Sequence, residues 1–166
     1  LEAIHQQILI APKIIRIKKL KKNIDKIIQT AYRVSEERKG PLLRYIIKSK
    51  NLNQVLVFTS SIHKADKVVE KLRHNGIEAK AIHSKKSQSL RTNTLERFKN
   101  GNLRVVVATD LLGRGIDIDS LPYIINYELP RSPKDYIHRI GRTGRAEASG
   151  EATVSYTHLR AHETEA

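Results

Sequence analysis

Two short, continuous apolar runs limit most strongly what this chain can fold into. Residues 55–58 read Val-Leu-Val-Phe, and residues 104–108 read Arg-Val-Val-Val-Ala. Runs of this length without polar alternation are typical of strands that are buried on both faces, as in parallel sheets covered by helices. Residues 123–125 repeat the pattern more weakly, and residues 77–82 form a shorter, more alternating candidate strand. The sequence therefore predicts several parallel strands.

Helical patterns lie between these predicted strands. Residues 61–74 have an apolar face, with Ser61 as an N-cap and Gly76 as the stop. Residues 87–99 form a second pattern that ends at Asn100-Gly101, and residues 41–49 form a third, in which Pro41 suits the first turn. Strands that alternate with helices at this spacing predict an α/β fold, a mostly parallel β-sheet sandwiched between helices on both faces. Ligands bind such sheets at the carboxyl ends of the strands.

The charge balance indicates a polyanionic partner. Lys and Arg number 31 against 17 Asp and Glu, which gives a net charge of +14 and an isoelectric point near 10.1. The absence of cysteine excludes disulfides and thiolate metal sites. No apolar run approaches the roughly 20 residues of a membrane span, and no secretory signal opens the chain, so we expect no membrane partner and a cytoplasmic location. Methionine is absent even at position 1, which indicates a piece of a larger protein.

The string His-Arg-Ile-Gly-Arg-Thr-Gly-Arg at residues 138–145 places four basic side chains and two glycines where a helix is expected to end. Arg142 and Arg145 are three residues apart, so on a helical turn they can point the same way and grip one polyanion. A solvated basic run is the alternative interpretation of such a cluster.

Four ordered motifs carry a resemblance to a known family. They are residues 55–60 (Val-Leu-Val-Phe-Thr-Ser), 88–91 (Gln-Ser-Leu-Arg), 108–110 (Ala-Thr-Asp) with 114–117 (Arg-Gly-Ile-Asp), and 138–145. From about Ile27 to Ala152 the chain resembles the second RecA-like domain of DEAD-box ATP-dependent RNA helicases, with the bacterial RhlE type closest. The resemblance implies a RecA-like version of the predicted fold.

The resemblance also implies roles for individual residues. Arg142 and Arg145 would act as catalytic arginines that reach the γ-phosphate of an ATP held mainly by a partner domain. The implied nucleotide-binding residues are Gly115, Asp117, His138 and Arg139, with Asp117 on the ribose and His138 linking nucleotide state to the domain interface. The implied RNA-backbone contacts are Thr59, Ser60, Arg91, Thr109, Asp110 and Gly115.

Ordinary structural roles stay open for several of these residues. Thr59 and Ser60 would serve equally as N-caps of the helix at 61, and Arg91 as an exposed helix residue. Asp110 and Asp117 suit caps or turns, and we favour a cap for Asp110. Ser84 stands where the family usually has glycine, which puts a phosphate contact of that backbone in question.

Three segments are expected along the chain. Residues 1–22 are interpreted as the last helix and strand of a preceding RecA-like domain followed by a basic linker, and residues 23–155 as the C-terminal RecA-like domain. Residues 156–166 do not continue the family pattern and resemble translated adapter or cloning sequence. His158 and His162 lack a third ligand, so no metal site is expected there.

The sequence thus predicts the C-terminal motor domain of an ATP-dependent RNA helicase, whose partners are RNA and the N-terminal RecA-like domain of the same parent protein. ATP is the expected cofactor, with Mg²⁺ held by that first domain. The 166 residues contain no Gly-x-x-x-x-Gly-Lys-Ser/Thr loop, so we expect this piece alone to be inactive. RNA contacts through the backbone are expected to be sequence-independent, with 2′-hydroxyls favouring RNA over DNA. The alternatives are a non-catalytic RNA-binding or scaffolding module and a DNA helicase domain of a related superfamily.

Overall fold

The computed structural model describes residues 26–110, 118, 120–144 and 150–157, in which six strands form one parallel sheet. The strands are β1 (Ile27–Arg33), β2 (Val55–Thr59), β3 (Ala79–Ile82), β4 (Val105–Thr109), β5 (Tyr123–Asn126) and β6 (Gly150–Tyr156). Their order across the sheet is β1-β6-β5-β2-β4-β3, and every pair is parallel. The predicted α/β class is therefore confirmed.

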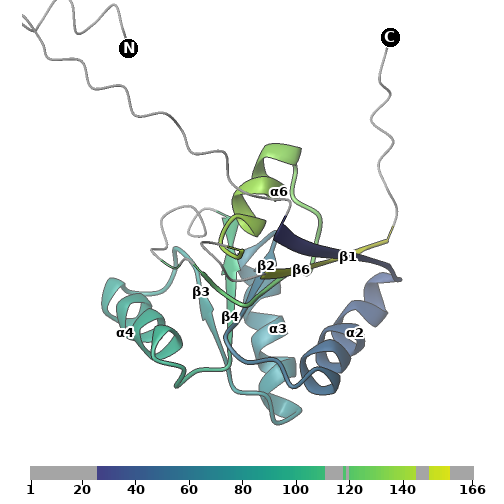
Figure 1. The fold of residues 1–166 in the computed structure, drawn as a ribbon. Helices are drawn as coiled ribbons and strands as arrows, with labels where there is room; N and C mark the ends of the chain where they lie inside the picture. The colour runs from purple at the N-terminus through teal and green to yellow at the C-terminus, as the bar shows by residue number, and fades with distance from the viewer. Residues whose placement is uncertain (1–25, 111–117, 119, 145–149, 158–166) are drawn as a thin grey trace, which may run out of the picture.

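Helices cover both faces of the sheet (Figure 1). The described helices are α2 (Glu36–Ser49), α3 (Ile62–His74), α4 (Gln88–Lys99) and α6 (Pro133–Ile140). The buried side chains of α2 and α3 pack in one apolar cluster, while those of α4 and α6 pack in a second cluster on the opposite face. Among the described residues, no helix has the length and apolarity that crossing a bilayer requires.

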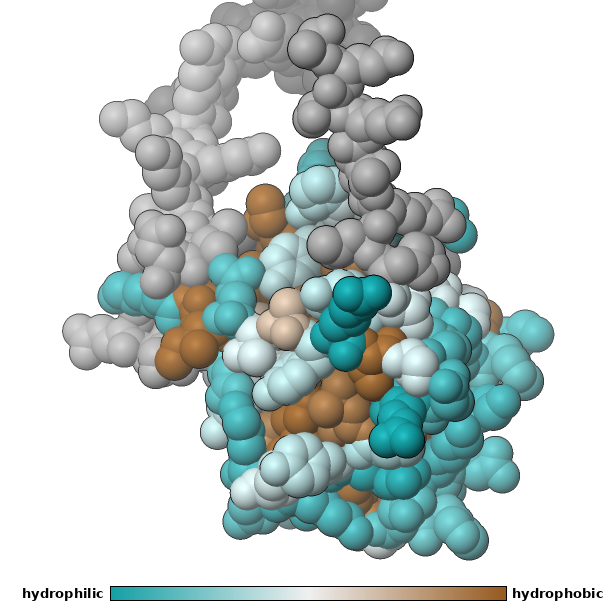
Figure 2. Space-filling model, turned by 90° about the vertical axis from the view of Figure 1, so that its right-hand side faces the viewer, coloured by the Kyte–Doolittle hydropathy of each residue, from teal (hydrophilic) through white to brown (hydrophobic). Residues whose placement is uncertain are grey.

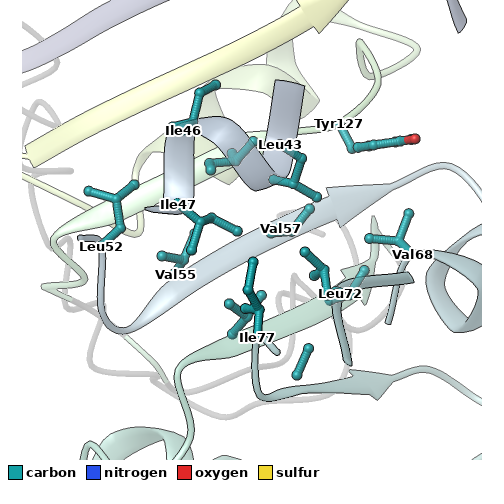
Figure 3. Close-up of a cluster of buried hydrophobic side chains, with 14 of the residues drawn as sticks. Leu43, Ile46, Ile47, Leu52, Val55, Val57, Val68, Leu72, Ile77 and Tyr127 are labelled. Carbon is teal, nitrogen blue, oxygen red and sulfur yellow. The ribbon is translucent and has the colours of Figure 1, made fainter. Parts of the chain in front are cut away.

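Alternate residues of β2 and β4 point into the two clusters, which is why both strands read as unbroken apolar runs. Val55 and Val57 face the cluster of α2 and α3, while Leu56 and Phe58 face the other. Figure 3 shows the first cluster, with side chains from α2, β2 and α3 converging. These residues are close to fully buried, so the centre of the sheet is a rigid support for whatever its strand ends carry.

Helix starts and stops largely follow the sequence prediction. The Ser61 hydroxyl accepts a hydrogen bond from the amide of Lys64 at 3.2 Å, which confirms the predicted N-cap of α3. Gly76 and Gly101 adopt φ values of +74° and +75° just after α3 and α4. The helix predicted at 41–49 begins five residues earlier, and Pro41 lies inside α2 rather than at its start. At the sixth helical position Pro41 removes the one hydrogen bond that an amide there would donate to the Glu37 carbonyl, a loss confined to the first turns of the helix.

Strand β1 and its neighbour β6 carry no apolar run that the sequence analysis identified. Only Ile27 of β1 is buried, and Ile28 is 63% exposed, because β1 is an edge strand. Figure 2 shows that the side of the molecule bearing α2 and β1 has apolar side chains at its centre and hydrophilic ones around them. Tyr156, which the sequence analysis assigned to the atypical tail, is the last residue of β6 and pairs with Arg33.

Candidate functional site

The carboxyl ends of β2 and β4 bring two of the expected RNA contacts together. Thr59 and Thr109 are register partners at the ends of these neighbouring strands. Both are buried, at 0% and 8% exposure, and the Thr59 hydroxyl donates to the Ser61 carbonyl at 3.3 Å. A ligand at this edge therefore meets the residues that follow each strand, the exposed Ser60 and the partly exposed Asp110, before it meets the threonine hydroxyls.

Ser60 is held by an acidic residue that follows β5. Its amide donates to the Glu128 carboxylate at 2.8 Å, and the same carboxylate forms an ion pair with Lys64 of α3. Lys64 also pairs with Glu36 of α2 at 3.2 Å. Burial alone would raise the pKa of Glu128, but the hydrogen bonds from Lys64 and Ser60 outweigh it and hold that pKa below its ordinary value. The Glu128 carboxylate thus engages both the amide and the hydroxyl of Ser60, and a phosphate at this position would have to compete with that carboxylate.

Arg139 of α6 is almost fully buried, at 3% exposure, and it bonds across the strand ends. Its Nε and Nη2 donate to the two carboxylate oxygens of Asp110 at 2.6 and 2.8 Å. Its Nη1 donates to the Asn126 side-chain oxygen at 2.9 Å and to the Glu128 carbonyl at 2.8 Å. The guanidinium of Arg139, for which the resemblance implies nucleotide binding, is thus enclosed and bonded within the protein. Asp110, which directly follows β4, therefore forms an ion pair with Arg139.

Arg142 lies in the turn that ends α6, and the backbone of this turn is fixed from two sides. Its carbonyl accepts from the Leu121 amide at 3.0 Å, while the Thr143 hydroxyl donates to the Leu121 carbonyl. Leu121 precedes β5, so this turn lies beside the start of β5 rather than at a carboxyl strand end. Gly144 follows with φ of +65°, and a Cβ there would lie 2.7 Å from Ile27 Cγ1. The partly exposed Arg142 side chain is thus presented by a turn that tolerates no bulk.

The other expected site residues lie on helices or outside the described part. Arg91 is half-buried on α4, and its guanidinium donates to the Gln88 side chain, so the two ends of the 88–91 motif contact each other. His138 is partly exposed on α6. Ser84 is exposed and is not among the residues with positive φ, so replacing glycine causes no backbone strain there. Gly115, Asp117 and Arg145 lie outside the described residues.

Three residues of this cluster were missed by the sequence analysis: Asn126, Glu128 and Lys64. Ligands bind such sheets at the carboxyl ends of the strands, and the residues after β5 lie at the same edge as those after β2 because β5 neighbours β2 in the sheet. Because the apolar pattern of residues 123–125 is weaker than that of residues 55–58 and 104–108, the residues that follow it did not stand out in the sequence. Within the described part of the chain, no three His, Cys, Asp or Glu side chains gather as a metal site would require.

Comparison with known proteins gives one family-model match, "Helicase conserved C-terminal domain", over residues 38–147. The chain is 40% identical to the "ATP-dependent RNA helicase RhlB" of Pseudomonas syringae pv. tomato over 139 residues, which cover 84% of this chain and 35% of that protein. It is 39% identical to the "ATP-dependent RNA helicase dbp2" of Neurospora crassa over 80% of this chain and 24% of that one. The chain therefore spans 35% and 24% of the length of these two curated relatives.

Solved structures share the fold. The C-terminal domain of the DEAD-box protein Dbp5 superposes with a TM-score of 0.74 at 29% identity, covering 81% of this chain and 78% of that one. A DEAD box protein from the hyperthermophile Methanococcus jannaschii gives the same TM-score at 38% identity, covering 80% of this chain and 36% of that one. The matched family model includes the strand ends around Ser60 and Asp110 as well as the turn that carries Arg142.

Proposed function

The chain belongs to the helicase conserved C-terminal domain family, as found in DEAD-box ATP-dependent RNA helicases, and from this premise we propose that it works as the second motor domain of such an enzyme. In this role it supplies Arg142 and Arg145 to an ATP that is bound mainly by the first RecA-like domain. The observation that carries the proposal is the fixed turn at the end of α6, which presents Arg142 on a backbone bonded to Leu121. The RhlE type remains a prediction, since the curated relatives include an RhlB and a dbp2.

The chemistry assigned to these arginines follows from the charge that develops in phosphoryl transfer. Negative charge spreads over the oxygens of the transferred phosphoryl group, and a guanidinium held in place beforehand stabilises it. Arginine suits this task better than lysine because its fork is planar and permanently charged. When bound, Mg²⁺ would neutralise phosphate charge, and the first domain is expected to hold it. The Asp110 carboxylate of this domain is already paired with Arg139. Asp117 and Gly115 would contact the nucleotide from the segment after β4.

RNA is proposed to lie along the carboxyl ends of β2 and β4. Arg91 on α4 offers a cation, and the exposed Ser60 offers a hydroxyl whose partner in this structure is Glu128. The buried Thr59 and Thr109 are register partners at the ends of the two strands. Contacts of this kind reach phosphates and sugars, so binding should depend on salt and not on base sequence. Competition between RNA and DNA oligonucleotides of equal length tests whether 2′-hydroxyls contribute, with RNA expected to win.

The decisive experiment measures RNA-dependent ATP hydrolysis by the intact parent protein carrying Arg142→Ala or Arg145→Ala. Loss of an arginine finger lowers kcat on the order of a thousandfold or more. ATP affinity should change only a few-fold, because the first domain holds the nucleotide. Arg73→Ala, an exposed arginine on the last turn of α3, is the matched control and should keep full activity. Normal turnover by both finger variants would refute the assignment.

The isolated chain provides a second test of the proposal. By itself it should hydrolyse no ATP above background and should bind RNA weakly, because it holds only one half of the composite site. Mixing it with a separately expressed first domain should restore RNA-stimulated hydrolysis. A chain that binds RNA tightly and never restores hydrolysis would instead be a non-catalytic binding module.

A further inference from the structure

Arg139 contacts all three central strand ends at once. The planar fork pairs with Asp110 after β4 through two donors, and it reaches Asn126 at the end of β5 through a third. Its guanidinium carbon also lies 5.1 Å from the ring centroid of Phe58, the residue before the last of β2. Cations over aromatic faces at this distance are attracted by the ring, more so when buried. One side chain of α6 therefore fixes that helix against β2, β4 and β5.

The bond to the Glu128 carbonyl extends this contact toward Ser60. Glu128 accepts from Arg139 through its backbone and from the Ser60 amide through its carboxylate. The RNA-side residue Ser60 is thus two hydrogen bonds from Arg139. The Arg139 carbonyl in turn accepts from the Arg142 amide at 3.2 Å. A continuous path of short contacts joins the strand end that carries Ser60 to the turn that carries Arg142.

The geometry demands an arginine at this position. A cation at 3% exposure is costly unless it is paired, and Asp110 provides the pairing with both oxygens. A lysine keeps the charge, but it is a single point of contact and cannot make the two-pronged bond to Asp110 while also reaching Asn126. Purely apolar packing would fill the same space at no electrostatic cost, so stability alone does not account for this group.

We propose that Arg139 is a positioning residue that couples RNA occupancy at the β2 and β4 ends to the placement of the Arg142 turn. This inference rests on the proposed function of Arg142. RNA that contacts Asp110 acts on a direct partner of the Arg139 fork, and RNA that contacts Ser60 acts on it through Glu128, so a shift of either residue reaches α6. Arg139 itself touches neither nucleotide nor RNA.

The test uses the intact parent protein with Arg139→Lys and Asp110→Asn, and it compares ATP turnover with and without RNA. The ratio of RNA-stimulated to basal turnover should fall about tenfold in each variant, within the usual range of coupling between two sites. The KM for ATP of each variant should stay within about twofold of the unsubstituted protein, because neither substitution changes a side chain that we propose to contact ATP. The double variant should be no worse than either single variant, since both remove the same bond.

Arg104→Lys is the matched control for a purely structural effect. Arg104 is also a partly buried arginine that donates to backbone carbonyls, those of Leu52 at 2.7 Å and Ile47 at 3.2 Å, but it lies at the opposite end of β4. It should lower the unfolding temperature and leave the stimulation ratio unchanged. If Arg139→Lys behaves in the same way, the positioning role is refuted. If Arg139→Lys does not fold, Asp110→Asn decides when RNA affinity is measured beside turnover, since its side chain is 36% exposed and the substitution keeps its shape. A lower stimulation ratio at saturating RNA supports the positioning role, and a loss of RNA affinity with a normal ratio at saturating RNA refutes it.

Failure of this inference is distinguishable from failure of the proposed function. Normal turnover in Arg142→Ala would refute the arginine finger, whatever Arg139→Lys does. Loss of turnover in Arg142→Ala together with an unchanged stimulation ratio in Arg139→Lys would retain the finger and refute the coupling.

Discussion

Replacing Gly150 with alanine tests how tightly the turn around Arg142 is packed. A Cβ at position 150 would lie 1.9 Å from the Thr143 hydroxyl oxygen and 2.5 Å from the Gly144 amide nitrogen. Both distances are far below van der Waals contact, and the second neighbour is backbone, which cannot rotate away. The Thr143 side chain can move only by giving up its hydrogen bond to the buried carbonyl of Leu121.

The magnitude follows from these two effects. Overpacking of a well-packed site costs about 1–3 kcal/mol, and leaving a buried carbonyl without its donor costs about 1–3 kcal/mol more. We therefore expect Gly150→Ala to reduce the free energy of unfolding by roughly 3 kcal/mol, taking the lower half of each range. For a domain of this size that lowers the unfolding temperature by about 10 °C.

Urea and thermal unfolding of the purified chain, followed by circular dichroism, measure this loss directly. Gly76→Ala is the matched control, because a Cβ there meets nothing within 4 Å and only its φ of +74° is unfavourable. That substitution should cost about 1–2 kcal/mol, the price of a left-handed non-glycine residue. If Gly150→Ala costs no more than Gly76→Ala, the packing argument for the Arg142 turn is wrong.

Two further predictions concern helix caps and acid stability. Ser61→Ala should destabilise the chain by about 1 kcal/mol in urea unfolding, whereas Ser35→Ala should have a near-zero effect, because Ser35 at the start of α2 makes no side-chain capping bond; equal effects would contradict the capping assignment. The pKa of Glu128 lies below its ordinary 4.5, so as the pH falls the unfolded chain binds this proton before the folded chain does. The ionised Glu128 therefore contributes its full stabilisation above pH 4.5, and this stabilisation is lost as the pH falls through the lower pKa that Glu128 has in the folded chain. Glu128→Gln should flatten the fall of unfolding free energy in a urea series from pH 6 to pH 3, and an unchanged slope would contradict the role of the ion pair with Lys64.

The centre of the fold could be predicted from the sequence because its physics is local. Residues 55–58 and 104–108 are buried on both faces and therefore read as unbroken apolar runs. The helix at 61–74 carries its own start and stop, a serine cap and a glycine with positive φ. The edge strand β1 could not be found in this way, since only Ile27 of its seven residues is buried and the strand depends on pairing with β6.

The site was predictable only in part, for a related reason. The family resemblance implied roles for Ser60, Asp110 and Arg142, which lie at strand ends or at the end of a helix. The partner of each depends on which strands are neighbours, and the sequence does not display that order. The resemblance implied that Arg139 binds the nucleotide, and only the tertiary structure gives it Asp110 and Asn126 as partners.

The pairing of β1 with β6 has a consequence for how the domain is made. The strand that leads the described chain lies beside the one that ends it, with Ile27 opposite Gly150 and Arg33 opposite Tyr156. During synthesis β1 is made before β6, so it stays unpaired until nearly all of the residues between these two strands have been added. Contacts so distant in sequence form slowly, because a long loop must close before they yield any stabilisation. The edge of β6 that faces β1 is therefore the last part of the sheet to be paired, because its two strands stand at opposite ends of the described chain.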